Sequence, residues 1–293
     1  MGCIHEITGH TKLTGLLGSP VAHSISPLMH NESFKMLGLD YVYLCFDVPE
    51  DNLETVFNGL KKLNIAGFNC TMPDKTRICQ LVDELSPAAS MIGAVNTVVN
   101  DNGKFIGHNT DGIGYMQSVK DAGYDITGST MTLLGAGGAA SSIFVQAALD
   151  GVKNINIFSI KDRFWEKAER MVEAVNKNTD CTARLMELGD DALLADSIAD
   201  SQILTNATSV GMAPNVDGCI VSDSSMLPEG LIVSDVIYNP METKLLKMAK
   251  ERGCKTFNGM YMLLYQGAEA FKIWTGREMP VEHIKKLYFN KNQ

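Results

Sequence analysis

The spacing of apolar residues along the chain alternates between a strand pattern and a helix pattern. Short runs over residues 13–18, 41–48 and 65–71 predict strands, because each is rich in aliphatic or aromatic side chains. Between them, residues 26–38 and 52–64 place apolar side chains at helical spacing and predict amphipathic helices. Residues 93–109 then predict a hairpin that turns at Asp101-Asn102-Gly103, since these residue types favour a tight turn.

The second half of the chain continues the alternation. We expect a helix over residues 111–123, a strand, turn and helix over 129–151, and a strand over 154–160. A long helix through Val175, strands within 199–208 and 231–240, and an apolar helix over 260–276 follow. Strands that alternate with helices at this spacing indicate an α/β fold with a parallel sheet covered on both faces. The sequence has no internal repeat or Gly/Pro/Ser-rich linker, so a domain junction has to be a helix or a tight loop.

The composition narrows the class of protein. The chain has 293 residues, of which 45% are hydrophobic and 20% charged, enough for one large domain or two smaller ones. Its net charge of −9 argues against nucleic acid or an anionic membrane as a partner, because both require a basic surface. No apolar stretch resembles a membrane span or a signal peptide. The seven cysteines are scattered and the histidines form no ligand cluster, so we expect a cytoplasmic protein without a metal.

A glycine pattern follows the strand expected just before residue 135. Gly135, Gly137 and Ala140 form G-x-G-x-x-A between a strand and a helix, where the glycines permit a sharp turn and close approach of a pyrophosphate. The start of the helix would supply N–H groups and a partial positive charge to the phosphates. The residues expected to contact a dinucleotide here are Gly135, Ala136, Gly137, Gly138 and Ala139. A tight turn without a ligand is the alternative.

The end of the next strand bears on the choice of dinucleotide. Ser159, Lys161 and Asp162 follow the glycines at about the distance at which the adenosine ribose is bound, roughly 20 residues. A carboxylate at Asp162 would accept from both ribose hydroxyls and repel a 2′-phosphate, whereas Lys161 would attract that phosphate. We therefore expect NAD to be preferred, with NADP possible. Asp162 could also serve as a helix N-cap.

A lysine is mounted on a stiff turn after the strand expected at 65–71. In "FNCTMPDKT" the residues Thr71, Pro73 and Asp74 end the apolar run, and Lys75 follows at once. A solvated loop cation is the simpler interpretation. An amine held in a cleft would instead be suited to moving a proton to or from a substrate oxygen.

Eight motifs in order resemble those of the shikimate dehydrogenase family, closest to its quinate/shikimate dehydrogenase branch. They are "GSPVAHSISPLMHN", "NCTMPDK", "GAVNTVV", "NTDG", "LLGAGGA", "TNATSVGM", "VIYNP" and "GMYMLLYQGAEAF". The resemblance implies an N-terminal α/β substrate domain over 1–111, to which 260–293 returns, and a Rossmann domain over 112–259. It also implies an enzyme: an NAD(P)-dependent oxidoreductase that interconverts shikimate, or quinate, and the 3-dehydro ketone. Such an activity belongs to aromatic amino acid biosynthesis or quinate metabolism.

The resemblance assigns roles to individual residues. It implies that Lys75 and Asp111 are the catalytic pair and that Ser24 and Ser26 hold the substrate carboxylate. Other expected substrate contacts are Thr71, Asn96 and Gln266, with Tyr43 and Tyr238 nearby. The nicotinamide end of the cofactor is expected at Asn206, Thr208, Ser209, Met212, Val236, Tyr238 and Gly259. "SIS" could equally be a helix cap with Ser26 as the N-cap residue, and the loop after 206 could be a simple turn.

Departures from the family pattern leave alternatives open. Cys70 replaces an apolar residue of the family's lysine motif, which affects packing alone. "SIKD" lacks the Asn-Arg-Thr of NADP-using members, which supports NAD. A dehydrogenase acting on another small polyhydroxy acid, such as an aminated shikimate, is one alternative, and a non-catalytic NAD-binding regulator is another. Besides a small-molecule substrate, a second copy in a homodimer is a possible partner.

Overall fold

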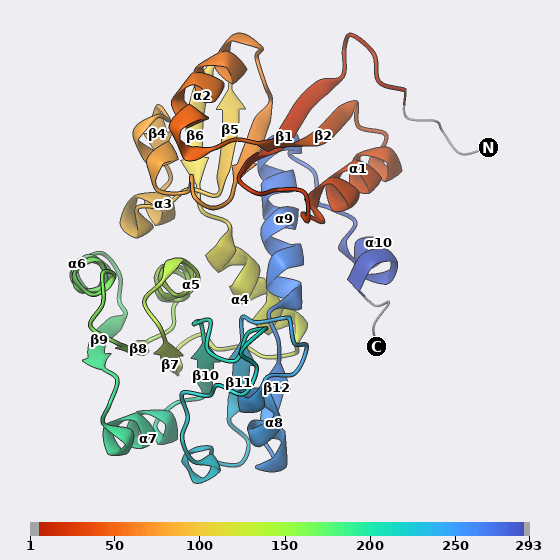
Figure 1. Cartoon of the computed structure of the whole chain (residues 1–293). Helices are drawn as coiled ribbons and strands as arrows, with labels where there is room; N and C mark the ends of the chain where they lie inside the picture. The colour runs from red at the N-terminus through yellow and green to blue at the C-terminus, as the bar shows by residue number, and fades with distance from the viewer. Residues whose placement is uncertain (1–5, 290–293) are drawn as a thin grey trace. The chain divides into compact units, whose positions relative to one another are not determined.

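The protein was analysed as a computed structural model in which residues 6–289 are described. Cys3, one of the cysteines considered above, lies outside the described residues. The chain divides into two compact units (Figure 1), the first formed by Met1–Thr110 with Leu264–Gln293 and the second by Asp111–Leu263. The expected divisions lay after residue 111 and before residue 260. The second observed division falls inside helix α9 (Met260–Thr275).

The first unit is built on a six-stranded mixed sheet. Its strands are β1 (Lys12–Gly18), β2 (Tyr41–Asp47), β3 (Gly67–Cys70), β4 (Glu84–Leu85), β5 (Thr97–Asp101) and β6 (Lys104–His108). They lie in the order β2-β1-β3-β5-β6-β4. The β1–β2 and β1–β3 pairs are parallel, whereas β5 runs antiparallel to β3 and β6. The antiparallel part of this sheet is the hairpin predicted from the turn at residues 101–103, which reverses the chain between β5 and β6.

Helices and short helical turns connect the strands of the first unit. They are α1 (Ser26–Leu37), α2 (Leu53–Lys62), α3 (Pro87–Ile92), part of α9, α10 (Val281–Ile284) and the single-turn π-helix Lys285–Phe289, with 3-10 turns at Glu50–Asn52 and Arg77–Gln80. In α2 the buried residues Leu53, Phe57 and Leu60 recur at helical spacing. Phe57 meets Phe68 of β3 and Phe105 of β6 edge to face, with ring centroids 6.0 and 5.5 Å away. This packing fixes the strand that precedes the lysine turn.

The second unit is a doubly wound parallel sheet. Its strands are β7 (Thr130–Leu134), β8 (Asn154–Ser159), β9 (Thr182–Glu187), β10 (Ile203–Asn206), β11 (Ile232–Asp235) and β12 (Lys255–Phe257). Every pair in the order β12-β11-β10-β7-β8-β9 is parallel. The chain leaves β7 toward one edge and returns at β10 toward the other. Ligands of such sheets bind outside the carboxyl ends of strands at this reversal.

Helices of the second unit connect the parallel strands. They are α4 (Asp111–Asp121), α5 (Gly138–Leu149), α6 (Trp165–Asn178), α7 (Asp191–Ala199) and α8 (Lys244–Glu251), with a 3-10 turn at Ser224–Met226. Tyr115 of α4 joins two strands, because its hydroxyl lies 2.5 Å from Thr205 Oγ1 and 2.8 Å from Ser234 Oγ. The helix expected through Val175 continues to Asn178. Among residues 6–289, no helix is both long and apolar enough to cross a membrane.

Candidate active site

The lysine turn of the first unit is held from both sides by backbone hydrogen bonds. Thr71 N donates to Leu17 O at 2.9 Å, and Ser19 N donates to Met72 O at 3.1 Å, which ties the turn to the loop after β1. Val95 N donates to Lys75 O at 2.8 Å and fixes the lysine backbone toward β5. Lys75 is half-buried. Its main chain is thus held like part of the sheet, which a solvated loop cation does not require.

Gly18 allows the two loops to come together. A Cβ at this position would lie 2.3 Å from Thr71 Cγ2 and 3.0 Å from Met72 O, closer than real side chains approach. The end of β1 therefore has to be glycine for the lysine turn to pack against it. This contact brings the Ser24 and Ser26 segment, which follows Gly18, to the same end of the sheet as Lys75.

The serines lie where the first loop enters α1. Ser24 Oγ accepts from Ser26 N at 3.2 Å, and Ser26 is buried. The N-cap residue of α1 is Ile25, without a side-chain cap hydrogen bond, so the expectation that Ser26 caps this helix is wrong. Ser26 instead begins the helix and Ser24 binds its N–H group. A hydroxyl and the first N–H groups of α1 can both donate to a carboxylate.

A buried amide organises the polar side of this unit. Asn96 is 2% exposed, and its Nδ2 donates to Thr110 Oγ1 at 2.9 Å and to Gln266 Oε1 at 3.4 Å. Asn96 Oδ1 accepts from Thr110 N at 2.8 Å. The side chain of Asn96 therefore joins three expected site segments of the first unit. They are the residues just before β5, the residues just before Asp111, and helix α9. Asp111 itself is the first residue of α4, in the second unit.

Asn69, which no sequence pattern singled out, supports Asn96 from the neighbouring strand. Asn69 Nδ2 donates to Asn96 O at 3.1 Å and to Thr97 Oγ1 at 3.0 Å, and its Oδ1 accepts from the Tyr43 hydroxyl at 2.8 Å. Tyr43 is fully buried, and burial raises the pKa of its phenol well above 10. The neutral phenol therefore acts as a donor behind the site. Tyr43 thus holds Asn69, and Asn69 in turn holds the main chain of Asn96.

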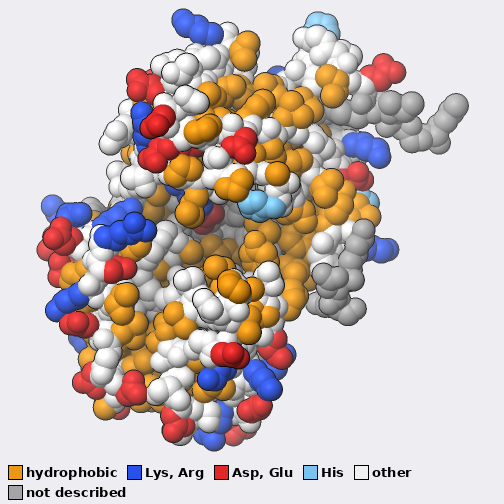
Figure 2. All heavy atoms as spheres, viewed as in Figure 1, with side chains coloured by type: hydrophobic (Ala, Val, Ile, Leu, Met, Phe, Trp, Pro, Cys, Tyr) orange, Lys and Arg blue, Asp and Glu red, His pale blue; other side chains and the backbone are white. Residues whose placement is uncertain are grey.

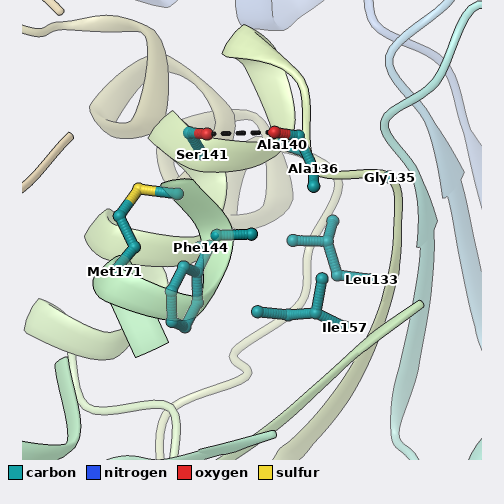
Figure 3. Close-up of a pocket in the computed structure, with 9 residues that line it drawn as sticks. Leu133, Gly135, Ala136, Ala140, Ser141, Phe144, Ile157 and Met171 are labelled. Atoms are coloured by element: carbon teal, nitrogen blue, oxygen red, sulfur yellow. Dashed lines mark hydrogen bonds between the residues drawn. The ribbon is translucent and has the colours of Figure 1, made fainter. Parts of the chain in front are cut away.

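The glycine turn of the second unit has the expected conformation. Gly135 has φ +107°, and a Cβ there would lie 2.8 Å from Thr208 Cγ2, so the turn is closed on that side. Added Cβ atoms at Gly137 and Gly138 would meet nothing within 4 Å. Beneath the turn lies a small apolar cavity between α5, α6 and the sheet (Figure 3), lined by residues that include Leu133, Phe144, Ile157 and Met171. The open side above the start of α5 fits the diphosphate of a dinucleotide.

The residues after β8 carry opposing charges. Asp162 is exposed and its Oδ1 accepts from Phe164 N at 2.8 Å, while the N-cap residue of α6 is Phe164. Lys161 Nζ lies 2.9 Å from Glu187 Oε2, and this hydrogen bond raises the pKa of the lysine. Arg163, which the sequence analysis did not consider, stacks its guanidinium 4.8 Å from the centroid of the Phe164 ring. The carboxylate of Asp162 and the cations of Lys161 and Arg163 therefore lie at the expected ribose position. Of the two cations, Lys161 is paired with Glu187.

The loop after β10 is ordered by a second buried amide. Asn206 Nδ2 donates to both carboxylate oxygens of Asp235 at 3.1 Å, and its Oδ1 accepts from Thr208 Oγ1 at 2.7 Å. Asp235 also accepts from Thr243 Oγ1 at 2.7 Å. Burial raises the pKa of Asp235, and these donors oppose the shift. Asp235 and Thr243 were not expected, although Asp235 directly ends an apolar strand, which was the available signal.

The remaining residues expected at the nicotinamide end of the cofactor differ in exposure. Met212 and Tyr238 are 46% and 48% exposed, and Ser209 is exposed as well. Gly259 packs on the main chain of Val236, because a Cβ there would lie 1.9 Å from Val236 O. Within residues 6–289, no group of three or more His, Cys, Asp or Glu side chains could hold a metal ion.

Comparison with known proteins decides the family. The family model for the shikimate dehydrogenase substrate binding domain matches residues 16–98, and that for the shikimate 5′-dehydrogenase C-terminal domain matches 259–287. A Listeria monocytogenes protein named shikimate dehydrogenase (NADP(+)) is 54% identical over 284 residues, 97% of this chain and 98% of that one. The chain belongs to the shikimate dehydrogenase family. An Escherichia coli quinate/shikimate dehydrogenase is 44% identical over 282 residues, 96% of this chain and 98% of that protein.

A solved structure agrees with this family and with the α/β fold. The crystal structure of shikimate 5-dehydrogenase from Listeria monocytogenes in complex with shikimate and NAD superposes with a TM-score of 0.94 at 54% identity. The superposition covers 97% of this chain and 98% of that one. In this member of the shikimate dehydrogenase family, the substrate-domain match contains the Lys75 turn and Asn96, and the C-terminal match contains Gly259 and Gln266.

Proposed function

We propose that the protein catalyses the reversible, NAD(P)-linked oxidation of the ring hydroxyl of shikimate, or of quinate, to the corresponding 3-dehydro ketone. The proposal rests on one observation above the others. This chain belongs to the shikimate dehydrogenase family, and the main chain of its Lys75 is fixed at the same end of the sheet as Ser24. Asn96 joins the neighbouring strand to Gln266. Such an enzyme acts in aromatic amino acid biosynthesis or in quinate metabolism.

The chemistry requires a proton acceptor at the hydroxyl and a donor at the ketone in reverse. Lys75 takes the hydroxyl proton, and Asp111 orients the ammonium and balances its charge. Ser24 and Ser26 donate to the ring carboxylate, while Thr71, Asn96 and Gln266 bind the ring hydroxyls. A nicotinamide held by the second unit would supply the acceptor for the hydride on the ring carbon. The fixed backbone of Lys75 keeps the amine from sampling unproductive positions.

The second unit supplies the residues that would hold the dinucleotide. Gly137 and Gly138 leave the start of α5 open, so its N–H groups can bind the diphosphate. Ala136, Ala139 and Ser159 border this turn and the next strand end. Thr208, Ser209, Met212, Val236, Tyr238 and Gly259 belong to the segments after β10 and β11 and before α9, where the nicotinamide is proposed to lie.

NAD is the preferred dinucleotide in this proposal. Asp162 is exposed at the ribose position, and Lys161 is already paired with Glu187, which weakens its attraction for a 2′-phosphate. Arg163 opposes the preference, although its guanidinium rests on Phe164. Among relatives, the Listeria structure contains NAD and the curated Listeria name specifies NADP(+). The preference is therefore one of degree, and NADP remains usable.

A steady-state panel tests the activity. Purified protein would be assayed with shikimate and quinate, each with NAD and NADP, by absorbance of the reduced nicotinamide. We expect turnover with at least one acid and a higher kcat/KM with NAD. An aminated shikimate added to the panel tests the alternative substrate. If the dinucleotide is not reduced with any of the acids, a non-catalytic dinucleotide-binding regulator becomes the better hypothesis. Dinucleotide binding measured by calorimetry would then support that hypothesis.

A homodimer and a cytoplasmic location complete the proposal. Strand β2 lies at a sheet edge, carries no charged residue before Asp47, and exposes 46% of Leu44. Figure 2 shows hydrophobic side chains gathered on the viewed face of the first unit. An unprotected edge strand can pair with its own copy. Light scattering of the native protein and of Leu44→Lys tests this, since a mass that is monomeric in both contradicts pairing through β2. The cytoplasmic location rests on composition.

A further inference from the structure

Asp74 is an unusual component of the lysine turn. Its side chain is 0% exposed, and neither carboxylate oxygen has a hydrogen-bond partner among the residues that the structure describes. The backbone around it is fixed, because Asp74 N donates to Thr71 O at 2.9 Å and Ile78 N donates to Asp74 O at 3.0 Å. The carboxyl group is therefore enclosed by the turn that carries Lys75, one residue further on.

The ionisable neighbours of Asp74 come from three elements. Glu50 belongs to the 3-10 turn before α2, Arg77 to the turn after Lys75, and Cys70 to the end of β3. Burial and the charge of Glu50 raise the pKa of Asp74, while Arg77 opposes them. Arg77 also donates its Nη1 to Glu50 O at 2.8 Å. Arg77, which opposes the rise, thus donates to a main-chain oxygen and makes no hydrogen bond to the Asp74 carboxylate.

The enclosure favours one protonation state. An ionised carboxylate without donors loses its hydration and gains nothing in return, whereas a neutral acid loses far less. We propose that Asp74 is a positioning residue for Lys75: the closed turn holds it as the neutral acid, and its ionisation drives it toward water and displaces the turn. The effect on Lys75 rests on the proposed catalytic role of that lysine, but the protonation state of Asp74 does not.

The pH dependence of stability tests the protonation state. A carboxyl group with a raised folded pKa stabilises the fold at low pH, and this contribution is lost as pH rises above the unfolded value of 3.8. Asp74→Asn keeps the shape of the neutral acid and has no such loss. The ratio of its folding equilibrium constant to that of the native protein should rise by up to about tenfold per pH unit until Asp74 ionises in the fold.

Asp83 in the same unit provides a matched control of opposite sign. Its Oδ2 accepts from Phe105 N at 2.8 Å, and this hydrogen bond lowers its pKa. Asp83→Asn should therefore lose stability relative to the native protein as pH rises toward 3.8, and show no further change above it. A stability ratio for Asp74→Asn that is flat with pH, or that falls as pH rises, would overturn the proposal.

The pH profile of kcat tests the positioning effect. With shikimate and saturating dinucleotide, the ratio of kcat for Asp74→Asn to native kcat should rise with pH through the same ionisation that the stability curves report. A constant ratio would show that Asp74 does not position Lys75, even where the stability curves show that it is protonated. No turnover by the native protein would refute the proposed function, and the stability curves would still decide the state of Asp74.

Discussion

Replacing His30 should change how the first unit responds to acid. His30 lies in α1, is fully buried, and neither ring nitrogen has a hydrogen-bond partner among the described residues. Its ring stacks on Tyr43 at 4.5 Å between centroids and lies 5.2 Å from Trp274 and 6.1 Å from Phe271. Burial lowers the pKa of His30 from 6.5 to about 3. The folded protein therefore keeps this imidazole neutral at pH values where the unfolded chain protonates it.

The size of the effect follows from the two pKa values. A depressed pKa for a base means that the unfolded state binds the extra proton, so stability is complete above pH 6.5 and falls as pH drops toward 3. At pH 4 the pH lies about 2.5 units below the unfolded pKa, which amounts to a loss of ~3.5 kcal/mol at about 1.4 kcal/mol per unit. His30→Phe should remove this loss. Any overpacking by the larger ring should lower the unfolding free energy by ~1–3 kcal/mol equally at every pH. It should therefore not change the slope of the unfolding free energy with pH.

The assay can follow the first unit alone. Trp274 lies in this unit and Trp165 in the other, so urea unfolding followed by fluorescence in a Trp165→Phe background reports on the surroundings of His30. Unfolding free energies of native and His30→Phe proteins would be compared from pH 7 to pH 4, with exposed His10→Asn as the control. Parallel curves for native and His30→Phe would refute the reasoning, since they would mean that His30 is not neutral and buried.

Further predictions concern the dinucleotide residues and the packing of the second unit. Asp162→Ala should narrow the ratio of kcat/KM between NAD and NADP, and an unchanged ratio would contradict the role of that carboxylate. Glu187→Gln should free Lys161 and improve kcat/KM for NADP by up to about fivefold, the worth of an exposed ion pair of ~0.2–1 kcal/mol; Glu242→Gln, which breaks the exposed pair with Lys250, is the control. Gly259→Ala should destabilise the second unit by ~1–3 kcal/mol through its contact with Val236 O. Gly59→Ala, in open space on α2, should not destabilise the first unit, and equal melting shifts in both variants would argue against this contact.

Local turn chemistry made parts of the fold predictable from the sequence. The hairpin between β5 and β6 turns where Asn102 and Gly103 adopt φ of +52° and +93°, conformations that these residues tolerate better than others. The glycine turn after β7 was equally predictable, because Gly135 adopts φ +107°, a conformation that residues with a side chain rarely adopt. The α/β fold and the family expected from these motifs are confirmed.

Other elements left no clear pattern in the sequence. Strand β9 was missed because its sequence, TARLME, carries Arg184 and ends on a charged residue, as an edge strand can. Helices α7 and α8 and strand β12 were also not anticipated.

The polar residues that support the site could not be recognised from the sequence for a different reason. Asn69 and Asp235 stand within or at the end of buried strands, and their partners Tyr43 and Asn206 are 26 and 29 residues away. Only the folded sheet brings such pairs together.

The kcat of Lys75→Ala tests the central claim most directly. With shikimate and NAD, the variant should lose ~10²–10⁴-fold in kcat, the effect of removing a positioned proton-transfer group, while its affinity for NAD stays close to native. Asp111→Asn should lower kcat too, and the double variant should lose far less than the product of the single losses, because the two residues act as one unit. Native turnover in Lys75→Ala would contradict the account and reduce Lys75 to an ordinary lysine on a turn.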